Sequence, residues 1–167
     1  MATITFQNNP LNTCGQLPKI GSRAPDFSLA NSELENVSLK NYAGKRKVLN
    51  IVPSLDTPTC AASARKFNQK AGNFENTVVL LISADLPFAQ CRFCEIESLD
   101  SVQALSTFRS SFGKDYGVEI CDSALAGLTA RAIVIIDEQD NVIYTQLVSE
   151  LANEPDYEAV FAALKSA

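Results

Sequence analysis

Cys60 is the residue best placed for chemistry, since it follows Pro53 and Thr57 in the pattern Pro-x-x-x-Thr-x-x-Cys. An apolar run ends at Pro53, and Thr57 followed by Pro58 is typical of a helix start, with the threonine as N-cap. Cys60 is therefore predicted in the first turn of a helix, where unpaired backbone N–H groups and the helix dipole favour negative charge. Because the thiolate is the nucleophilic form of cysteine, this placement indicates a reactive thiol.

The sequence contains no histidine. This excludes Ser-His-Asp and Cys-His hydrolase sites, zinc signatures built on histidine, and haem held by a proximal histidine. A nucleophilic cysteine in this chain must be activated without a neighbouring imidazole.

Five cysteines are present, an odd number that does not suggest a secreted disulfide scaffold. A reducing compartment with at least one working thiol fits better. Cys91 and Cys94 form a C-x-x-C pair, which alone suggests a redox dithiol. Zinc binding would need a further cysteine to complete the ligand set, so we expect no metal. Cys14 and Cys121 are expected to be passive.

Length and charge indicate one globular domain over residues 1–167. The net charge of −5 argues against binding to nucleic acid or to anionic membranes by bulk charge. The N-terminus lacks the basic start and apolar core of a signal peptide, and no apolar run is long enough to span a bilayer. We therefore expect a cytoplasmic protein.

Apolar periodicity and turn residues predict the elements that position Cys60. Strands are expected over 3–6, 24–30, 47–52, 77–84, 131–137 and 141–148, and helices from Thr57 to Gly72, from 87 to about 99 and over 155–165. This order predicts an α/β protein with a thioredoxin-like fold. Its mixed central sheet is flanked by helices and preceded by an N-terminal strand or hairpin extension.

Several segments resemble peroxiredoxins, and the resemblance covers nearly the whole chain. The motif Pro53, Thr57 and Cys60 matches their active site. Further matching segments are Gly21–Leu29 and Lys45–Pro53, with Ser83–Ala89 and Arg92–Cys94 similar to bacterial thiol peroxidases in particular. The resemblance implies an antioxidant enzyme that reduces hydrogen peroxide and organic hydroperoxides with no metal, haem or flavin.

The same resemblance implies a role for each matching residue. Cys60 would attack a peroxide oxygen and become a sulfenic acid. Pro53 would shield the sulfur from water, Thr57 would bond the sulfur and the peroxide, and Arg131 would stabilise the developing negative charge. Cys94 would act as the resolving cysteine and form an internal disulfide with Cys60.

Thioredoxin is the reductant that the resemblance implies, together with a homodimer and a preference for lipid-like hydroperoxides. Two alternatives stay open on the sequence alone. One is a dithiol-disulfide oxidoreductase that uses Cys91 and Cys94. The other is a peroxide-responsive redox sensor that forms the same internal disulfide without efficient turnover.

Overall fold

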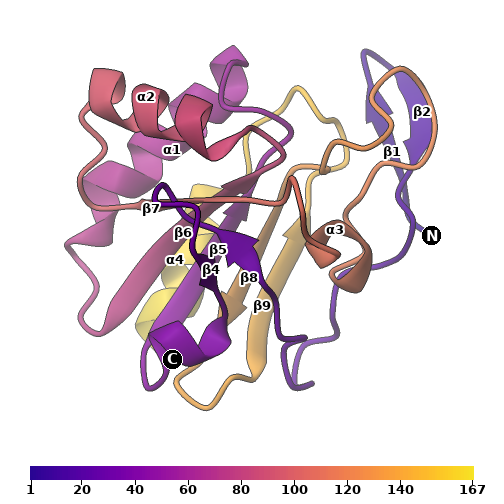
Figure 1. Ribbon diagram of the computed structural model, residues 1–167. Helices are drawn as coiled ribbons and strands as arrows, with labels where there is room; N and C mark the ends of the chain where they lie inside the picture. Colours follow the sequence, from indigo (N-terminus) through magenta and orange to yellow (C-terminus); the bar gives the residue numbers. More distant parts are fainter.

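Three apolar strands form the centre of the main sheet in the computed structural model, which describes residues 1–167 (Figure 1). They are β5 (Arg46–Ile51), β6 (Thr77–Ser83) and β8 (Ala132–Ile136). β5 pairs in parallel with β6 and antiparallel with β8, so the sheet is mixed. The seven strands follow the order β4-β3-β7-β6-β5-β8-β9. The outer strands are β3 (Leu29–Ala30), β4 (Asn36–Val37), β7 (Gln103–Ser106) and β9 (Val142–Leu147).

Both faces of the sheet are covered, because successive residues of its central strands point to opposite sides. Val48 faces a cluster that includes Phe67 of α1 (Pro58–Ala71) and Val160 of α4 (Tyr157–Ser166). Leu49 faces the other cluster, which contains buried residues from positions 24–42 and 112–118. That second face is covered in part by the 3₁₀ helix η1 (Leu39–Tyr42) and the short α3 (Phe112–Asp115). The remaining helix, α2 (Pro87–Glu97), packs beside β7.

The N-terminus forms a separate antiparallel hairpin of β1 (Thr3–Phe6) and β2 (Asn9–Asn12), visible at one side of Figure 1. Backbone hydrogen bonds join Thr5 to Ser149 and Leu151, in the segment after β9. Ile4 and Leu11 pack into a small apolar cluster with Leu151. The hairpin is therefore docked on the end of the sheet where β8 begins.

The predicted fold class is confirmed: the protein is α/β, with a mixed sheet flanked by helices and an N-terminal hairpin extension. Strand and helix bounds around the centre of the chain agree with the sequence to within about two residues. β4 and β7 and the short helices η1 and α3 are not expected from the sequence, because each has four residues or fewer and lacks a clear apolar period. β2 is expected only as part of a hairpin extension, without bounds of its own.

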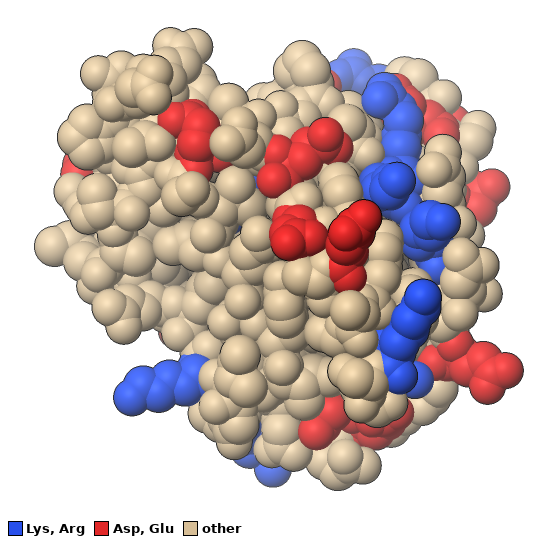
Figure 2. Space-filling model, turned by 180° about the vertical axis from the view of Figure 1, so that it is seen from behind, with Lys and Arg blue, Asp and Glu red and all other residues tan.

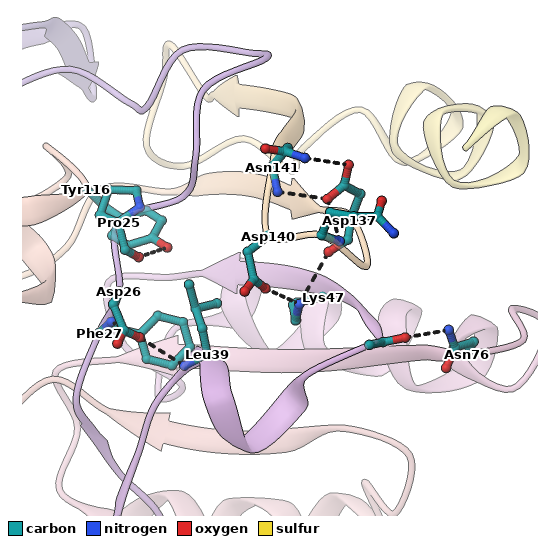
Figure 3. Close-up of polar contacts among 12 residues, drawn as sticks. Pro25, Asp26, Phe27, Leu39, Lys47, Asn76, Tyr116, Asp137, Asp140 and Asn141 are labelled. Atoms are coloured by element: carbon teal, nitrogen blue, oxygen red, sulfur yellow. Dashed lines mark hydrogen bonds and ion pairs between the residues drawn. The ribbon is translucent and has the colours of Figure 1, made fainter.

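The strand predicted over 24–30 is wrong for most of its length, since only Leu29–Ala30 pairs as β3. The Asp26 carboxylate accepts hydrogen bonds from the backbone N–H groups of Phe27 and Leu39 (Figure 3). The Pro25 carbonyl accepts one from the Tyr116 hydroxyl. Side chains thus satisfy this backbone, and Pro25 has no N–H to offer a neighbouring strand.

Charged side chains are unevenly distributed on the face shown in Figure 2. Lys and Arg gather along one side with Asp and Glu next to them, whereas a broad part of the face carries neither. Even the longest helix, α1, has only 14 residues, so none of the helices could span a bilayer.

Candidate active site

Cys60 lies in the first turn of α1, as predicted, and its side chain is fully buried. Thr57 is the N-cap: its Oγ1 accepts a hydrogen bond from the Cys60 backbone N–H at 3.3 Å. The same hydroxyl donates to the carbonyl of Ser54 at 3.3 Å, which fixes the turn that precedes the helix. Pro58 occupies the first helical position. The sulfur is therefore held at the end of a helix whose dipole favours an anion.

A buried hydrogen-bonded pair holds the body of α1 against the sheet. Asn50 of β5 donates to the Ser63 hydroxyl at 3.0 Å, and that hydroxyl donates back to Asn50 Oδ1 at 3.2 Å. Both residues are fully buried. Because a buried polar pair has few alternative partners, it fixes how the helix sits on β5.

Arg131 approaches Cys60 from the strand next to β5. Ala132 of β8 pairs with Ile51 at the end of β5, so Arg131 lies beside the segment that leads to Cys60. Its Nη1 is 3.3 Å from Cys60 Sγ, and its Nε donates to the Leu151 carbonyl at 3.1 Å. Only 2% of Arg131 is exposed, and none of the three ion pairs of the protein includes it. A buried guanidinium without a carboxylate partner is available to stabilise a negative charge at the thiol.

A cavity of about 310 Å³ opens beside these groups. Pro53, Thr57 and Arg131 line it on the side of the sheet and helix. Apolar side chains from distant segments form much of the remaining wall: Phe6, Leu125, Leu128 and Leu151. The sequence analysis missed these wall residues, because no local pattern links the N-terminal hairpin, the loop before β8 and the loop after β9.

Cys94 lies near the end of α2 and is half-buried. It packs against an apolar cluster that contains Cys60 and Leu55, so both predicted redox cysteines border the same part of the core. They are not bonded: all five cysteines are free thiols. Burial, with a smaller contribution from Cys91, raises the pKa of Cys94 to about 11. The Cys94 carbonyl accepts the Leu99 N–H at 2.9 Å, within the turn that ends the helix.

Cys91 lies one turn before Cys94 and lines a different cavity, of about 340 Å³, together with it. Its thiol donates to the Glu95 carboxylate at 3.5 Å, and this hydrogen bond raises the pKa of Cys91. Cys14 and Cys121 lie elsewhere, on either side of the bridge between Thr13 and Ile120. The structure contains no group of three or more Cys, Asp or Glu side chains arranged to hold a metal ion.

A buried thiol in a helix N-terminal turn, facing an unpaired arginine at the edge of a cavity, suits a nucleophile that attacks a small polar substrate. Comparison with known proteins agrees with this geometry, because residues 19–161 match the family model described as Redoxin. The chain belongs to the Redoxin family. Within the family it is 51% identical over 164 residues to a thiol peroxidase of Corynebacterium glutamicum, covering 98% of this chain and 99% of that protein. A thiol peroxidase of Mycobacterium bovis is 52% identical with the same coverage.

A solved structure of a peroxiredoxin-like protein from Aquifex aeolicus superposes with a TM-score of 0.94 at 38% identity, over 99% of this chain and 97% of that one. The predicted class of enzyme, a thiol-dependent peroxidase of the peroxiredoxin type, is thereby confirmed. These relatives do not favour the alternatives of a dithiol oxidoreductase or a redox sensor.

Proposed function

We propose that this chain reduces hydrogen peroxide and organic hydroperoxides through Cys60 and resolves the product with Cys94. The observation that carries the proposal is the 3.3 Å contact between Arg131 Nη1 and Cys60 Sγ, at a sulfur that is fully buried next to a cavity. The guanidinium stays charged and favours the thiolate, which is the attacking form.

In the first step the Cys60 thiolate attacks one oxygen of the peroxide and the O–O bond breaks. Cys60 becomes a sulfenic acid, and the second oxygen leaves as an alkoxide or hydroxide that takes up a proton. Arg131 stabilises the negative charge as it moves from sulfur to the leaving oxygen. Thr57 contributes a hydroxyl at the cavity edge, and the buried Pro53 keeps water from the sulfur.

In the second step the Cys94 thiol displaces the hydroxyl of the sulfenic acid. A Cys60–Cys94 disulfide forms and water leaves. We infer that Cys60 leaves its position against Arg131 for this step, since its side chain is fully buried there and both thiols are free in the reduced protein. Unwinding of the first turn of α1 and of the last turn of α2 provides such a movement at low cost, since helix ends open more readily than the core.

The resemblance to thiol peroxidases supports the remaining parts of the proposal. Thioredoxin reduces the disulfide by exchanging its own dithiol for it, and no metal, haem or flavin takes part. The 167 residues act as one domain in a homodimer in the cytoplasm, and the apolar wall of the cavity supports a preference for organic over inorganic peroxides.

The test is to map the cysteines after one equivalent of peroxide, by mass spectrometry of a non-reduced digest. We expect a Cys60–Cys94 disulfide with Cys91 free. Cys60→Ser should stay folded and lose essentially all turnover. Cys94→Ser should react once, accumulate sulfenic acid and then overoxidise, because the second step is blocked.

Cys91→Ser is the matched control on the same helix, and it should turn over almost normally with thioredoxin. A Cys91–Cys94 bridge with a free Cys60, or a Cys91→Ser variant that stops turnover while Cys94→Ser does not, would contradict the assignment.

A further inference from the structure

The Asp85 carboxylate joins the two segments that lead to Cys60 and to Cys94. Asp85 lies between the end of β6 at Ser83 and the start of α2. Its Oδ1 accepts a hydrogen bond from the Ser54 hydroxyl at 2.7 Å. Its Oδ2 accepts one from the Leu55 backbone N–H at 2.8 Å and another from the Ser83 hydroxyl at 2.7 Å. One side chain therefore satisfies donors from two different loops.

On the side of Cys60, these bonds fix the turn immediately before α1. The Ser54 carbonyl accepts the Thr57 hydroxyl at 3.3 Å, and that hydroxyl accepts the Cys60 N–H at 3.3 Å. Hydrogen bonds on the side chain and on the carbonyl of Ser54 thus connect the Asp85 carboxylate to the backbone of Cys60 through this one residue. Leu55, whose N–H Asp85 binds, is 2% exposed and packs in the same apolar cluster as Cys60.

On the side of Cys94, the same network reaches into α2. The Ser83 hydroxyl, which donates to Asp85, also accepts a hydrogen bond from Gln90 Nε2 at 3.0 Å. Gln90 belongs to α2, is 1% exposed and also donates to the Leu105 carbonyl at 2.9 Å. The helix that carries Cys94 is therefore held to the sheet through groups that Asp85 also binds.

We propose that Asp85 is a positioning residue that stabilises the closed arrangement, in which Cys60 faces Arg131, over the opened one in which Cys60 reaches Cys94. This inference rests on the proposed roles of Cys60 and Cys94. The Cys60 sulfenic acid has two fates. A second peroxide oxidises it to a sulfinic acid and releases an alcohol or water, or Cys94 forms the disulfide and releases water. By holding the closed arrangement, Asp85 favours peroxide attack and delays the disulfide.

Asp85→Asn tests this inference with little change of volume. An amide has one acceptor oxygen and places N–H donors where the second carboxylate oxygen accepted two hydrogen bonds. Loss of about one net hydrogen bond changes an equilibrium by roughly fivefold. We expect the opened population to rise by about that factor, and with it the peroxide concentration that overoxidises half of Cys60 during turnover. Sulfenic acid formation should slow by much less, because the closed arrangement still predominates.

The matched control is Asp56→Asn, which changes an exposed carboxylate of the same turn that accepts no hydrogen bond in the structure. It should leave both quantities unchanged. Ser54→Ala removes the bond to Oδ1 and the bond that the Ser54 hydroxyl accepts from the Asp56 backbone N–H, but it keeps both bonds to Oδ2. It should move both quantities in the same directions by less. This second variant keeps the test valid if Asp85→Asn fails to fold.

Stopped-flow oxidation and mass spectrometry of Cys60 measure the two quantities, with the wild type alongside. A role in general stability alone would not make peroxide attack slower and overoxidation harder in the same variant. The inference is overturned if folded Asp85→Asn behaves as wild type, or if attack slows while overoxidation becomes easier. Failure of the underlying function is separately visible, because the wild type would then show no Cys60–Cys94 disulfide.

Discussion

The two ends of the strand pair β5 and β8 each bury one cation, and the two cations have different partners. At one end Arg131 is 2% exposed and contacts the Leu151 carbonyl and the Cys60 sulfur. At the other end Lys47 is fully buried and forms an ion pair with Asp140 at 2.5 Å. Figure 3 shows this second end, with Lys47 pointing into the turn between β8 and β9.

At the Lys47 end, the buried ammonium group has both an ion-pair partner and a hydrogen-bond acceptor. Lys47 also donates to the Asp137 carbonyl at 3.3 Å, and the Asp137 carboxylate accepts hydrogen bonds from the backbone N–H and the side chain of Asn141 (Figure 3). The Asp140 carbonyl accepts the backbone N–H of Ala24, which ties the N-terminal segment to the same turn. The charge of Lys47 is balanced by the Asp140 carboxylate within the fold, so this end has a structural role.

The Arg131 end is left unbalanced by comparison. A carbonyl oxygen and a thiol carry no full negative charge. The free-energy cost of burying the guanidinium is therefore offset only when the thiol ionises or a leaving oxygen becomes negative. The contrast indicates how to tell a structural buried cation from one that serves a reaction. The first has a carboxylate partner, and the second faces a group that becomes charged during the chemistry.

The largest expected effect comes from removing the unbalanced cation. Arg131→Ala should slow the reaction of Cys60 with peroxide by on the order of 100- to 1,000-fold, because a buried donor to the developing charge is lost. Stopped-flow oxidation of the reduced protein measures the rate. Arg131→Lys keeps the charge without the planar fork, and it should recover only part of the loss. An unchanged rate in folded Arg131→Ala would show that Arg131 does not assist the reaction, and the contrast drawn between the two buried cations would then be wrong.

Removing the balanced cation should instead affect stability. Lys47→Met leaves the Asp140 carboxylate without its partner, and we expect the free energy of unfolding to fall by about 3 kcal/mol. Urea denaturation measures this change. The peroxide rate per folded molecule should stay at the wild-type value, and a rate that falls as far as in Arg131→Ala would show that the two ends are not independent.

Adding Asp140→Asn to Lys47→Met should restore most of the lost free energy of unfolding. Asn lacks the unpaired charge and tolerates the left-handed backbone of Asp140, whose φ is 66°. The double variant should be within about 1 kcal/mol of the wild type, since replacing both members of a buried pair costs far less than breaking it. A loss as large as in Lys47→Met alone would mean that packing of Lys47, and not its charge balance, explains the effect.

The smallest effect concerns the Cys94 thiol. Its pKa is raised from 9.0 to about 11 chiefly by burial, so between these values the folded protein binds more protons than the unfolded chain. This contribution to stability is fully present below pH 9 and is lost as the pH rises towards 11. Because Cys94 is partly exposed, we expect less than about 1 kcal/mol. Between pH 9 and about pH 11, the free energy of unfolding of the reduced wild type should fall by more than that of Cys94→Ser. Equal losses in the two proteins would contradict the raised pKa of Cys94.

The placement of Cys60 could be predicted from sequence because its causes are local. Thr57 and Pro58 define the helix start, and the apolar run before Pro53 defines the strand, so Cys60 had to fall in the first turn. The fold class followed from the same kind of pattern, since the central strands are long and uninterrupted.

The contact with Arg131 depends on the pairing of β5 with β8, which are about eighty positions apart in the chain. The resemblance to peroxiredoxins indicates the role of Arg131, whereas the periodicity of apolar residues carries no information about it. The bonds of Asp85 and the apolar wall formed by Phe6 and Leu125 arise from loops brought together only by the whole sheet. The wrong strand prediction at 24–30 has a related origin, because the Asp26 side chain and the distant Tyr116 hydroxyl bond that backbone in place of a neighbouring strand.

The N-terminal hairpin places Phe6 in the wall of the cavity, although neither of its strands belongs to the main sheet. The Glu150 carboxylate fastens it by accepting hydrogen bonds from the Thr5 hydroxyl and from the N–H groups of Gln7 and Asn8. The shape of the entrance is thus set by a piece of chain that contributes nothing to breaking the O–O bond. Natural variation or engineering in this hairpin can therefore change which peroxides are accepted while the reacting thiol and its guanidinium stay as they are.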